Sequence, residues 1–198
     1  TGGYVTAYLW ETVLQKDSFL DILQKFISYQ KEVKKTTLPD GKVRTDTAEK
    51  IIFPRYHQLD VVRKLVYHTR EHGPGHNYLI QHSAGSGKSN SIAWTAYRLA
   101  SLHDDENRAI YNSVIIVTDR KVLDSQLQNT IDSFDHTLGS VVLIDEKKSS
   151  KDLLKAVNDG KRIIVTTLQK FPVIYDLVGD TTGKAFAVIV DEAHSSQT

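Results

Sequence analysis

The chain has 198 residues, of which 40% are hydrophobic and 25% are charged, and its formal net charge at pH 7 is +1. This composition is typical of a soluble globular protein with one full hydrophobic core. The near-zero charge gives no global argument for nucleic-acid binding, so any such contact has to come from locally placed lysine and arginine. The absence of cysteine excludes a disulfide framework and a thiolate metal site.

No apolar run reaches the roughly 18 residues that a membrane-spanning helix needs, and no signal-peptide pattern opens the chain. We therefore expect a cytoplasmic protein with no membrane partner. The chain begins at Thr1, contains no methionine and ends at Thr198. Both ends are expected to continue into a larger protein.

Residues 4–30 carry hydrophobic residues at helical spacing and predict short helices, the second of them capped by Asp17 or Ser18. Residues 31–50 break this spacing with polar residues and the sequence Pro39-Asp40-Gly41, which predicts a turn or short hairpin in a surface connector. We therefore expect two parts, a helical linker and connector over residues 1–50 and a larger domain over residues 51–198.

The larger domain follows a different pattern. Residues 55–71 place Leu59, Val62 and Val66 on one face of a predicted helix. Short apolar runs then alternate with helical segments, at residues 78–80, 114–117, 141–144, 163–165 and 187–190. Continuous β-branched runs are typical of strands buried on both faces. The alternation predicts an α/β fold, a mostly parallel sheet with helices on both faces, whose functional residues lie beyond the carboxyl ends of the strands.

A glycine-rich loop lies between the predicted strand at 78–80 and a helical stretch at 92–97. Glycines allow backbone N–H groups to turn toward an anion, and a helix N-terminus adds partial positive charge. We expect Lys88 to reach the β- and γ-phosphates of ATP and the Ser89 hydroxyl to hold Mg²⁺. The predicted nucleotide-binding residues of the loop are His82, Ser83, Ala84, Gly85, Ser86, Gly87, Lys88 and Ser89.

The general phosphate-loop pattern has glycine at the first position, where this sequence has His82. This departure indicates a subfamily. The alternative, a glycine-rich turn without function, is disfavoured by the predicted strand before the loop and the predicted helix after it.

Two acidic residues, Asp191 and Glu192, directly follow the last apolar run. A carboxylate at the end of a buried strand beside the phosphate loop suits a second Mg²⁺ contact, which we assign to Asp191. Glu192 is expected to polarise the attacking water as a general base. Two solvated acids at a strand end are the alternative, but together with the phosphate loop the pair indicates ATP hydrolysis.

The motifs together resemble a known family. Asp191-Glu192-Ala193-His194 resembles motif II of superfamily 2 helicases. Nearly the whole chain is similar to the linker and first RecA-like domain of the restriction (motor) subunit of type I restriction-modification enzymes. The segments that carry this resemblance are 8–18, 55–58, 81–89, 117–120, 166–171 and 191–197.

The resemblance implies roles for further residues. Gln58 corresponds to the glutamine that reads adenine, for which an amide offers a donor and an acceptor. His194 corresponds to the histidine that links the ATP site to the second motor domain. Contacts with the DNA backbone are implied for Thr118, Arg120, Thr166, Thr167, Gln169 and Lys170. The threonines also suit helix N-caps, and both roles are compatible.

The resemblance also implies a function. The chain is expected to be the ATP-binding half of a motor that translocates double-stranded DNA as part of a type I site-specific deoxyribonuclease. Its partners are then the modification (methyltransferase) and specificity subunits. The nuclease residues are expected in an upstream domain and a catalytic arginine in a second RecA-like domain, so the chain alone should be poorly active. The alternatives are the motor domain of another superfamily 2 DNA or RNA helicase and a nucleotide-binding switch without hydrolysis, against which Glu192 argues.

Overall fold

The computed structural model describes residues 4, 6–37, 43–118, 127, 130–131, 140–144, 148–170 and 183–192. The chain forms two compact units, Thr1–Arg55 and Tyr56–Thr198. Within the residues that are described, no helix is long and apolar enough to span a membrane.

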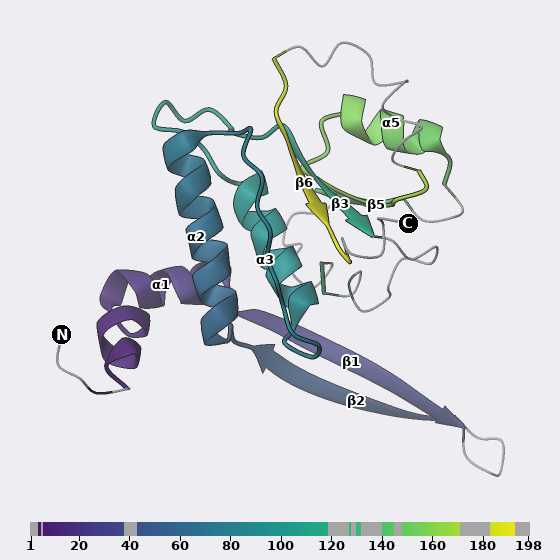
Figure 1. Cartoon of the computed structure of the whole chain (residues 1–198). Helices are drawn as coiled ribbons and strands as arrows, with labels where there is room; N and C mark the ends of the chain where they lie inside the picture. Colours follow the sequence, from purple (N-terminus) through teal and green to yellow (C-terminus); the bar gives the residue numbers. More distant parts are fainter. Residues whose placement is uncertain are drawn as a thin grey trace. The chain divides into compact units, whose positions relative to one another are not determined.

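The first unit contains a π-helical turn η1 (Leu9–Val13) and helix α1 (Lys16–Lys25) (Figure 1). Both fall in the segment predicted to be helical, but the predicted cap is wrong. The N-cap of α1 is Gln15, whose ψ of 138° lies outside the helical region, and Asp17 and Ser18 lie inside the helix. Asp17 is an acidic residue of the first turn, where it interacts favourably with the helix dipole.

The hairpin predicted after this helix is present and is long. Strand β1 (Ser28–Thr37) pairs antiparallel with β2 (Val43–Ile52), from Ser28 opposite Ile52 to Thr37 opposite Val43. The sequence predicts only a short hairpin because β2 is exposed at nearly every position, so no apolar alternation marks the strands. The Pro39-Asp40-Gly41 sequence lies outside the described residues.

The second unit is an α/β domain. Its helices are α2 (Tyr56–His72), α3 (Lys88–Ala100) and α5 (Ser150–Asn158). Its strands are β3 (Ser113–Thr118), β4 (Val141–Leu143), β5 (Ile163–Thr167) and β6 (Phe186–Val190). They form one sheet in the order β4-β5-β3-β6, and every pair is parallel (Figure 1). The predicted fold class and these four strands are confirmed.

The strand predicted at residues 78–80 is wrong. These residues have no regular secondary structure, and Leu79 is 93% exposed. None of the described strands pairs with this segment, and a strand without a neighbour leaves its backbone hydrogen bonds unmade. Three apolar residues in a row therefore did not specify a strand here.

Helices cover both faces of the sheet. All residues of β3 and β5 are buried, which requires cover on both sides. On one face Ile164 packs with Ile144 and with Leu153, Ala156 and Val157. The last three belong to α5, whereas α3 contacts β3 and carries the fully buried Trp94. Figure 1 shows α3 and α5 on opposite sides of the strands. The predicted two-sided cover is confirmed.

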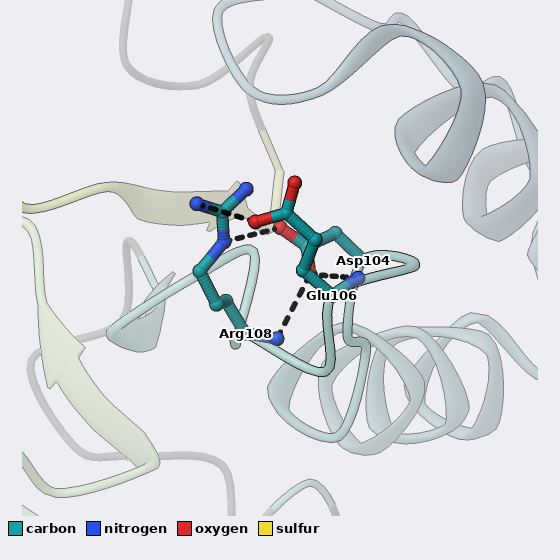
Figure 2. Close-up of polar contacts among 3 residues, drawn as sticks. All are labelled: Asp104, Glu106 and Arg108. Carbon is teal, nitrogen blue, oxygen red and sulfur yellow. Dashed lines mark hydrogen bonds and ion pairs between the residues drawn. The ribbon is translucent and has the colours of Figure 1, made fainter.

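The loop from α3 to β3 is closed by Asp104 (Figure 2). Its Oδ1 accepts the backbone N–H groups of Glu106 at 3.0 Å and Arg108 at 2.8 Å, and its Oδ2 accepts Nε of Arg108 at 2.9 Å. The backbone hydrogen bond from Arg108 is the main cause that lowers the pKa of Asp104. This turn lies in the short connection between the helix that follows the phosphate loop and the central strand β3.

Ile164 provides a test of the sheet's core. It is fully buried, so Ile164→Ala should lower the free energy of unfolding by about 2–5 kcal/mol through lost burial and the cavity left behind. Ile80→Ala is the matched control, since Ile80 is 42% exposed and should cost about 1 kcal/mol or less. Urea unfolding of the two variants measures the difference. Equal losses would contradict this account of the core.

Candidate functional site

The glycine-rich loop leads directly into α3, as its sequence predicts. Gly87 is the N-cap of α3 with φ 83°, and Gly85 has φ 71°. Both angles lie in the left-handed region that favours glycine. A Cβ atom on Gly87 would also lie 2.5 Å from Nε2 of Gln58, so the Gln58 side chain would have to shift to make room for it. The loop therefore presents the N-terminus of a 13-residue helix, a site suited to an anion.

Lys88 joins this loop to the end of β6. Its Nζ lies 3.2 Å from Oδ1 of Asp191 and forms a hydrogen-bonded ion pair with Oε1 of Glu192. The backbone N–H of Asp191 donates to the carbonyl of Val117 at 2.9 Å, which fixes this acid to the central strand. The phosphate loop and the acidic strand end thus form one site, although 103 residues separate Lys88 from Asp191 in sequence.

The charges in this site stabilise one another. Burial lowers the pKa of Lys88, but the hydrogen bond from Lys88 to Glu192 and the charge of Asp191 outweigh it, so the pKa of Lys88 is raised. The side chains remain partly open to solvent, with 38% of Lys88, 19% of Asp191 and 32% of Glu192 exposed. A ligand anion has access to the lysine, which holds its positive charge at neutral pH.

Glu192 adopts an unusual backbone conformation. Its φ is 57°, in the left-handed region that non-glycine residues rarely occupy. Such a conformation costs about 1–3 kcal/mol and is found where other contacts hold it. Its ion pair with Lys88 is one such contact, and the turn points the Glu192 side chain toward the loop instead of continuing the strand.

The oxygen donors fit a magnesium ion. Asp191 Oδ1 is buried and, within the described part of the chain, accepts no hydrogen bond although it forms the ion pair with Lys88. A cation or its bound water would satisfy this oxygen. The described residues contain no group of three or more acidic or histidine side chains that could enclose a metal. Mg²⁺ usually takes one or two protein ligands and completes its shell with water and phosphate oxygens.

The first turn of α2 contacts the other side of the loop. Nε2 of Gln58 donates to the carbonyl of Gly87 at 2.9 Å and to that of Ser86 at 3.3 Å. His57 Nε2 lies 3.1 Å from the same Ser86 carbonyl. Gln58 is only 2% exposed. In this structure its amide N–H groups are directed to the loop, and its predicted contact with adenine stays a prediction.

His82 lies against Ser86 from within the loop. Its Nδ1 is 3.2 Å from the Ser86 hydroxyl, and its ring meets that of His57 edge-on at 5.6 Å between centroids. Burial, then the charge on His57 and on Lys88, lower the pKa of His82. Histidine in place of the usual glycine is thus held neutral beside the loop, where a second positive charge would oppose that of Lys88. The sequence alone assigns no role to His57, because its contact with Ser86 depends on how α2 packs against the loop.

Of the residues predicted to bind DNA, Thr118 lies at the carboxyl end of β3, Thr166 and Thr167 lie at that of β5, and Gln169 and Lys170 follow β5. Their exposure differs. The side chains of Thr118, Thr166 and Thr167 are buried, at 3%, 0% and 2% exposed. Gln169 is exposed, and Nζ of Lys170 donates to the carbonyl of Lys148 at 2.6 Å. Arg120 and His194 lie outside the described residues.

The remaining loop residues differ in their exposure to solvent. Ser83, Ala84 and Gly85 are exposed, and Ser86 is buried with its N–H donating to the carbonyl of Ser83 at 3.2 Å. Ser89 lies in the first turn of α3, one residue after Lys88. The open part of the loop and the helix start are therefore adjacent, as binding of a phosphate chain requires.

A glycine-rich loop at a helix N-terminus, with its lysine on the acids of a parallel strand, defines a phosphate-loop nucleotide-binding domain. A family model described as SWI2/SNF2 ATPase matches residues 57–198. The chain belongs to this ATPase family, whose domains are RecA-like. The second unit is thus an ATPase domain of the helicase-like motor type.

Relatives of the chain include endonuclease subunits of type I restriction enzymes. The subunit named HindI from Haemophilus influenzae is 28% identical over 194 residues, covering 93% of this chain and 17% of the relative. The SauCOLORF180P subunit from Staphylococcus aureus is 30% identical over 148 residues, 72% of this chain and 14% of the relative. The chain therefore spans about a sixth of the length of these relatives, and the resemblance predicted from its motifs is confirmed.

The lowered pKa of His82 predicts a pH dependence. Because the folded state binds the proton less readily than the unfolded state, whose ordinary pKa is 6.5, this histidine reduces stability as the pH falls below 6.5. In the isolated chain, the free energy of unfolding should therefore decrease between about pH 7.5 and about pH 5.5 more in the wild type than in His82→Asn. Urea unfolding at both pH values measures this. An unchanged pH dependence in the variant would show that His82 is not held neutral.

Proposed function

We propose that the chain is the ATP-binding half of a DNA-dependent ATPase that translocates double-stranded DNA in a type I restriction-modification complex. The observation that carries the proposal is the ion-pair contact of Lys88 with Asp191 and Glu192, which brings a phosphate-binding lysine to two strand-end acids. The names of the relatives, which are endonuclease subunits of type I restriction enzymes, support the assignment to this complex.

In the proposed mechanism the phosphates of ATP replace the carboxylates of Asp191 and Glu192 as the partners of Lys88. The backbone N–H groups at the start of α3 and the ammonium of Lys88 neutralise the β- and γ-phosphates. The Ser89 hydroxyl and Asp191 would hold Mg²⁺, which would reduce the negative charge of the phosphates. Two carboxylates already face one lysine in this site, so a triphosphate without a divalent cation would be repelled.

The same exchange releases the proposed base. In this structure Glu192 is paired with Lys88, which directs the carboxylate to the lysine. Once Lys88 binds phosphate, Glu192 is released from it and accepts a proton from the attacking water. Binding of ATP thereby prepares the carboxylate for hydrolysis.

The finer assignments extend this proposal. Gln58 reads adenine, and His194 links the site to a second motor domain. Contact with the DNA backbone is assigned to Thr118, Arg120, Thr166, Thr167, Gln169 and Lys170. The exposed Gln169 and the cationic Lys170 support this most directly, whereas the buried threonines would contribute through neighbouring backbone groups.

The partners proposed for the intact protein are double-stranded DNA and the modification and specificity subunits, in the cytoplasm. The recognised DNA sequence is then a property of the specificity subunit. Within this chain, only contacts that ignore base identity are assigned, because a motor that moves along DNA has to bind every sequence.

Two substitutions in the intact protein test the proposal. Lys88→Ala should lower DNA-stimulated ATP hydrolysis by about 10²–10³-fold through loss of charge stabilisation at the phosphates. Glu192→Gln should lower kcat by about 10²-fold or more while ATP still binds. Phosphate release with and without double-stranded DNA, and displacement of a third strand from the duplex, measure hydrolysis and translocation.

Lys64→Ala is the matched control, because Lys64 is an exposed lysine of α2 that pairs with Asp60 on the same helix. It should leave both activities unchanged. Hydrolysis that persists in Lys88→Ala would refute the assigned site. Hydrolysis stimulated by RNA and not by duplex DNA would instead identify another superfamily 2 motor.

A further inference from the structure

Side chains on the first turn of α2 form hydrogen bonds with backbone carbonyl groups of the loop. His57 and Gln58, adjacent on this turn, direct their side-chain Nε2 atoms to Ser86 O at 3.1 and 3.3 Å, and Gln58 also to Gly87 O at 2.9 Å. A carbonyl oxygen only accepts hydrogen bonds, so His57 carries its hydrogen on Nε2. The two carbonyls of the loop just before Lys88 are therefore held by one helix.

Holding a carbonyl also orients the next N–H group. A peptide unit is planar, and in a trans peptide the N–H of one residue points opposite to the C=O of the residue before it. The described peptide bonds are not cis. With the Ser86 carbonyl directed to α2, the N–H of Gly87 points away from α2. The Gly87 carbonyl orients the N–H of Lys88 in the same way.

The two carbonyl groups that Gln58 and His57 contact differ in the other hydrogen bonds that they accept. The Gly87 carbonyl also accepts the N–H groups of Asn90 at 3.1 Å and Ser91 at 3.3 Å, so the start of α3 keeps it in place. The hydrogen bonds described for the Ser86 carbonyl come from the two α2 side chains, and the 3.1 Å contact of His57 is the shorter. The orientation of the Gly87 N–H therefore depends on these two side chains, and the Ser86 carbonyl is the loop atom that His57 contacts.

A second histidine, His82, contacts the side chain of Ser86. His82 Nδ1 lies 3.2 Å from the Ser86 hydroxyl, and Ser86 is 9% exposed. The two rings meet edge-on. Ser86 is thus contacted at its backbone oxygen by His57 and at its side-chain oxygen by His82, which restricts rotation of the residue between the two left-handed glycines.

We infer that His57 is a positioning residue for the phosphate loop: its hydrogen bond to the Ser86 carbonyl directs the Gly87 N–H toward the phosphate chain of the nucleotide. The inference rests on the proposed function, since it requires that the loop bind phosphates. The proposed role of His57 affects binding of the triphosphate and not of the base. His57 therefore contributes equally to binding of ATP, GTP and inorganic triphosphate, in contrast to the adenine contact predicted for Gln58.

The test uses three variants of the intact protein, His57→Ala, His57→Met and His57→Gln. Loss of one oriented hydrogen bond should raise the KM for ATP and the Kd of magnesium triphosphate by about fivefold to tenfold in the Ala and Met variants. The kcat should change by less than about twofold, because the contact is present before and during reaction. Glutamine restores an N–H donor near the position of Nε2, so His57→Gln should lie within about twofold of the wild type.

His76→Ala serves as the control, because His76 is an exposed histidine whose ring contacts are with His68 and His72. The Met and Gln variants have similar size, so their comparison separates the hydrogen bond from packing if His57→Ala unfolds. Equal affinities of these two variants for triphosphate would overturn the inference. So would a loss confined to ATP with triphosphate binding unchanged.

The outcome also separates this inference from the function on which it rests. If the wild type binds triphosphate and the Lys88→Ala variant does not, the nucleotide site is supported. Unchanged triphosphate binding in His57→Met then refutes only the role of His57. If the wild type binds neither ATP nor triphosphate, both are refuted. Weaker triphosphate binding in His57→Met, together with near-wild-type binding in His57→Gln, supports both the nucleotide site and the role of His57.

Discussion

The contact of Lys88 with Asp191 and Glu192 is the interaction on which the account of the site depends. It joins the N-terminus of α3 to the carboxyl end of β6, two elements that are far apart in sequence. The parallel sheet makes this meeting possible, because β3 lies beside β6 and carries Val117, whose carbonyl fixes the N–H of Asp191. Without this contact the loop and the acids would be two unrelated features of the surface.

The loop has two functional sides. Its carbonyl groups at Ser86 and Gly87 are bound by α2, and its lysine is bound by the acids of β6. The fixed carbonyls leave the N–H groups directed away from α2, while the lysine contact is charged, partly exposed and exchangeable for phosphate. The structure thus combines backbone groups held by hydrogen bonds with a charged contact that is partly open to solvent, and the residue with positive φ, Glu192, belongs to the charged contact.

Much of this arrangement is predictable from sequence because it rests on local rules. Strands β3 and β5 are continuous β-branched runs buried at every position, and α2 shows its apolar face in Leu59, Val62 and Val66. Residues 78–80 are also three apolar residues in a row, but a strand requires a neighbour, which a local pattern does not reveal. The hairpin of β1 and β2 is longer than its sequence predicts for the opposite reason, since an exposed strand carries no apolar alternation. The contact of His57 with Ser86 depends on the packing of α2 against the loop, and no spacing rule predicts it.

The most direct test of the central claim is a crystal structure of the intact protein with Mg²⁺ and a non-hydrolysable ATP analogue. The triphosphate should lie between the start of α3 and Asp191, with Lys88 Nζ within about 3 Å of a phosphate oxygen and no longer paired with Glu192. The metal should then be held through Ser89 and Asp191. An analogue bound elsewhere, or a Lys88 that keeps both carboxylates while the nucleotide is present, would contradict it.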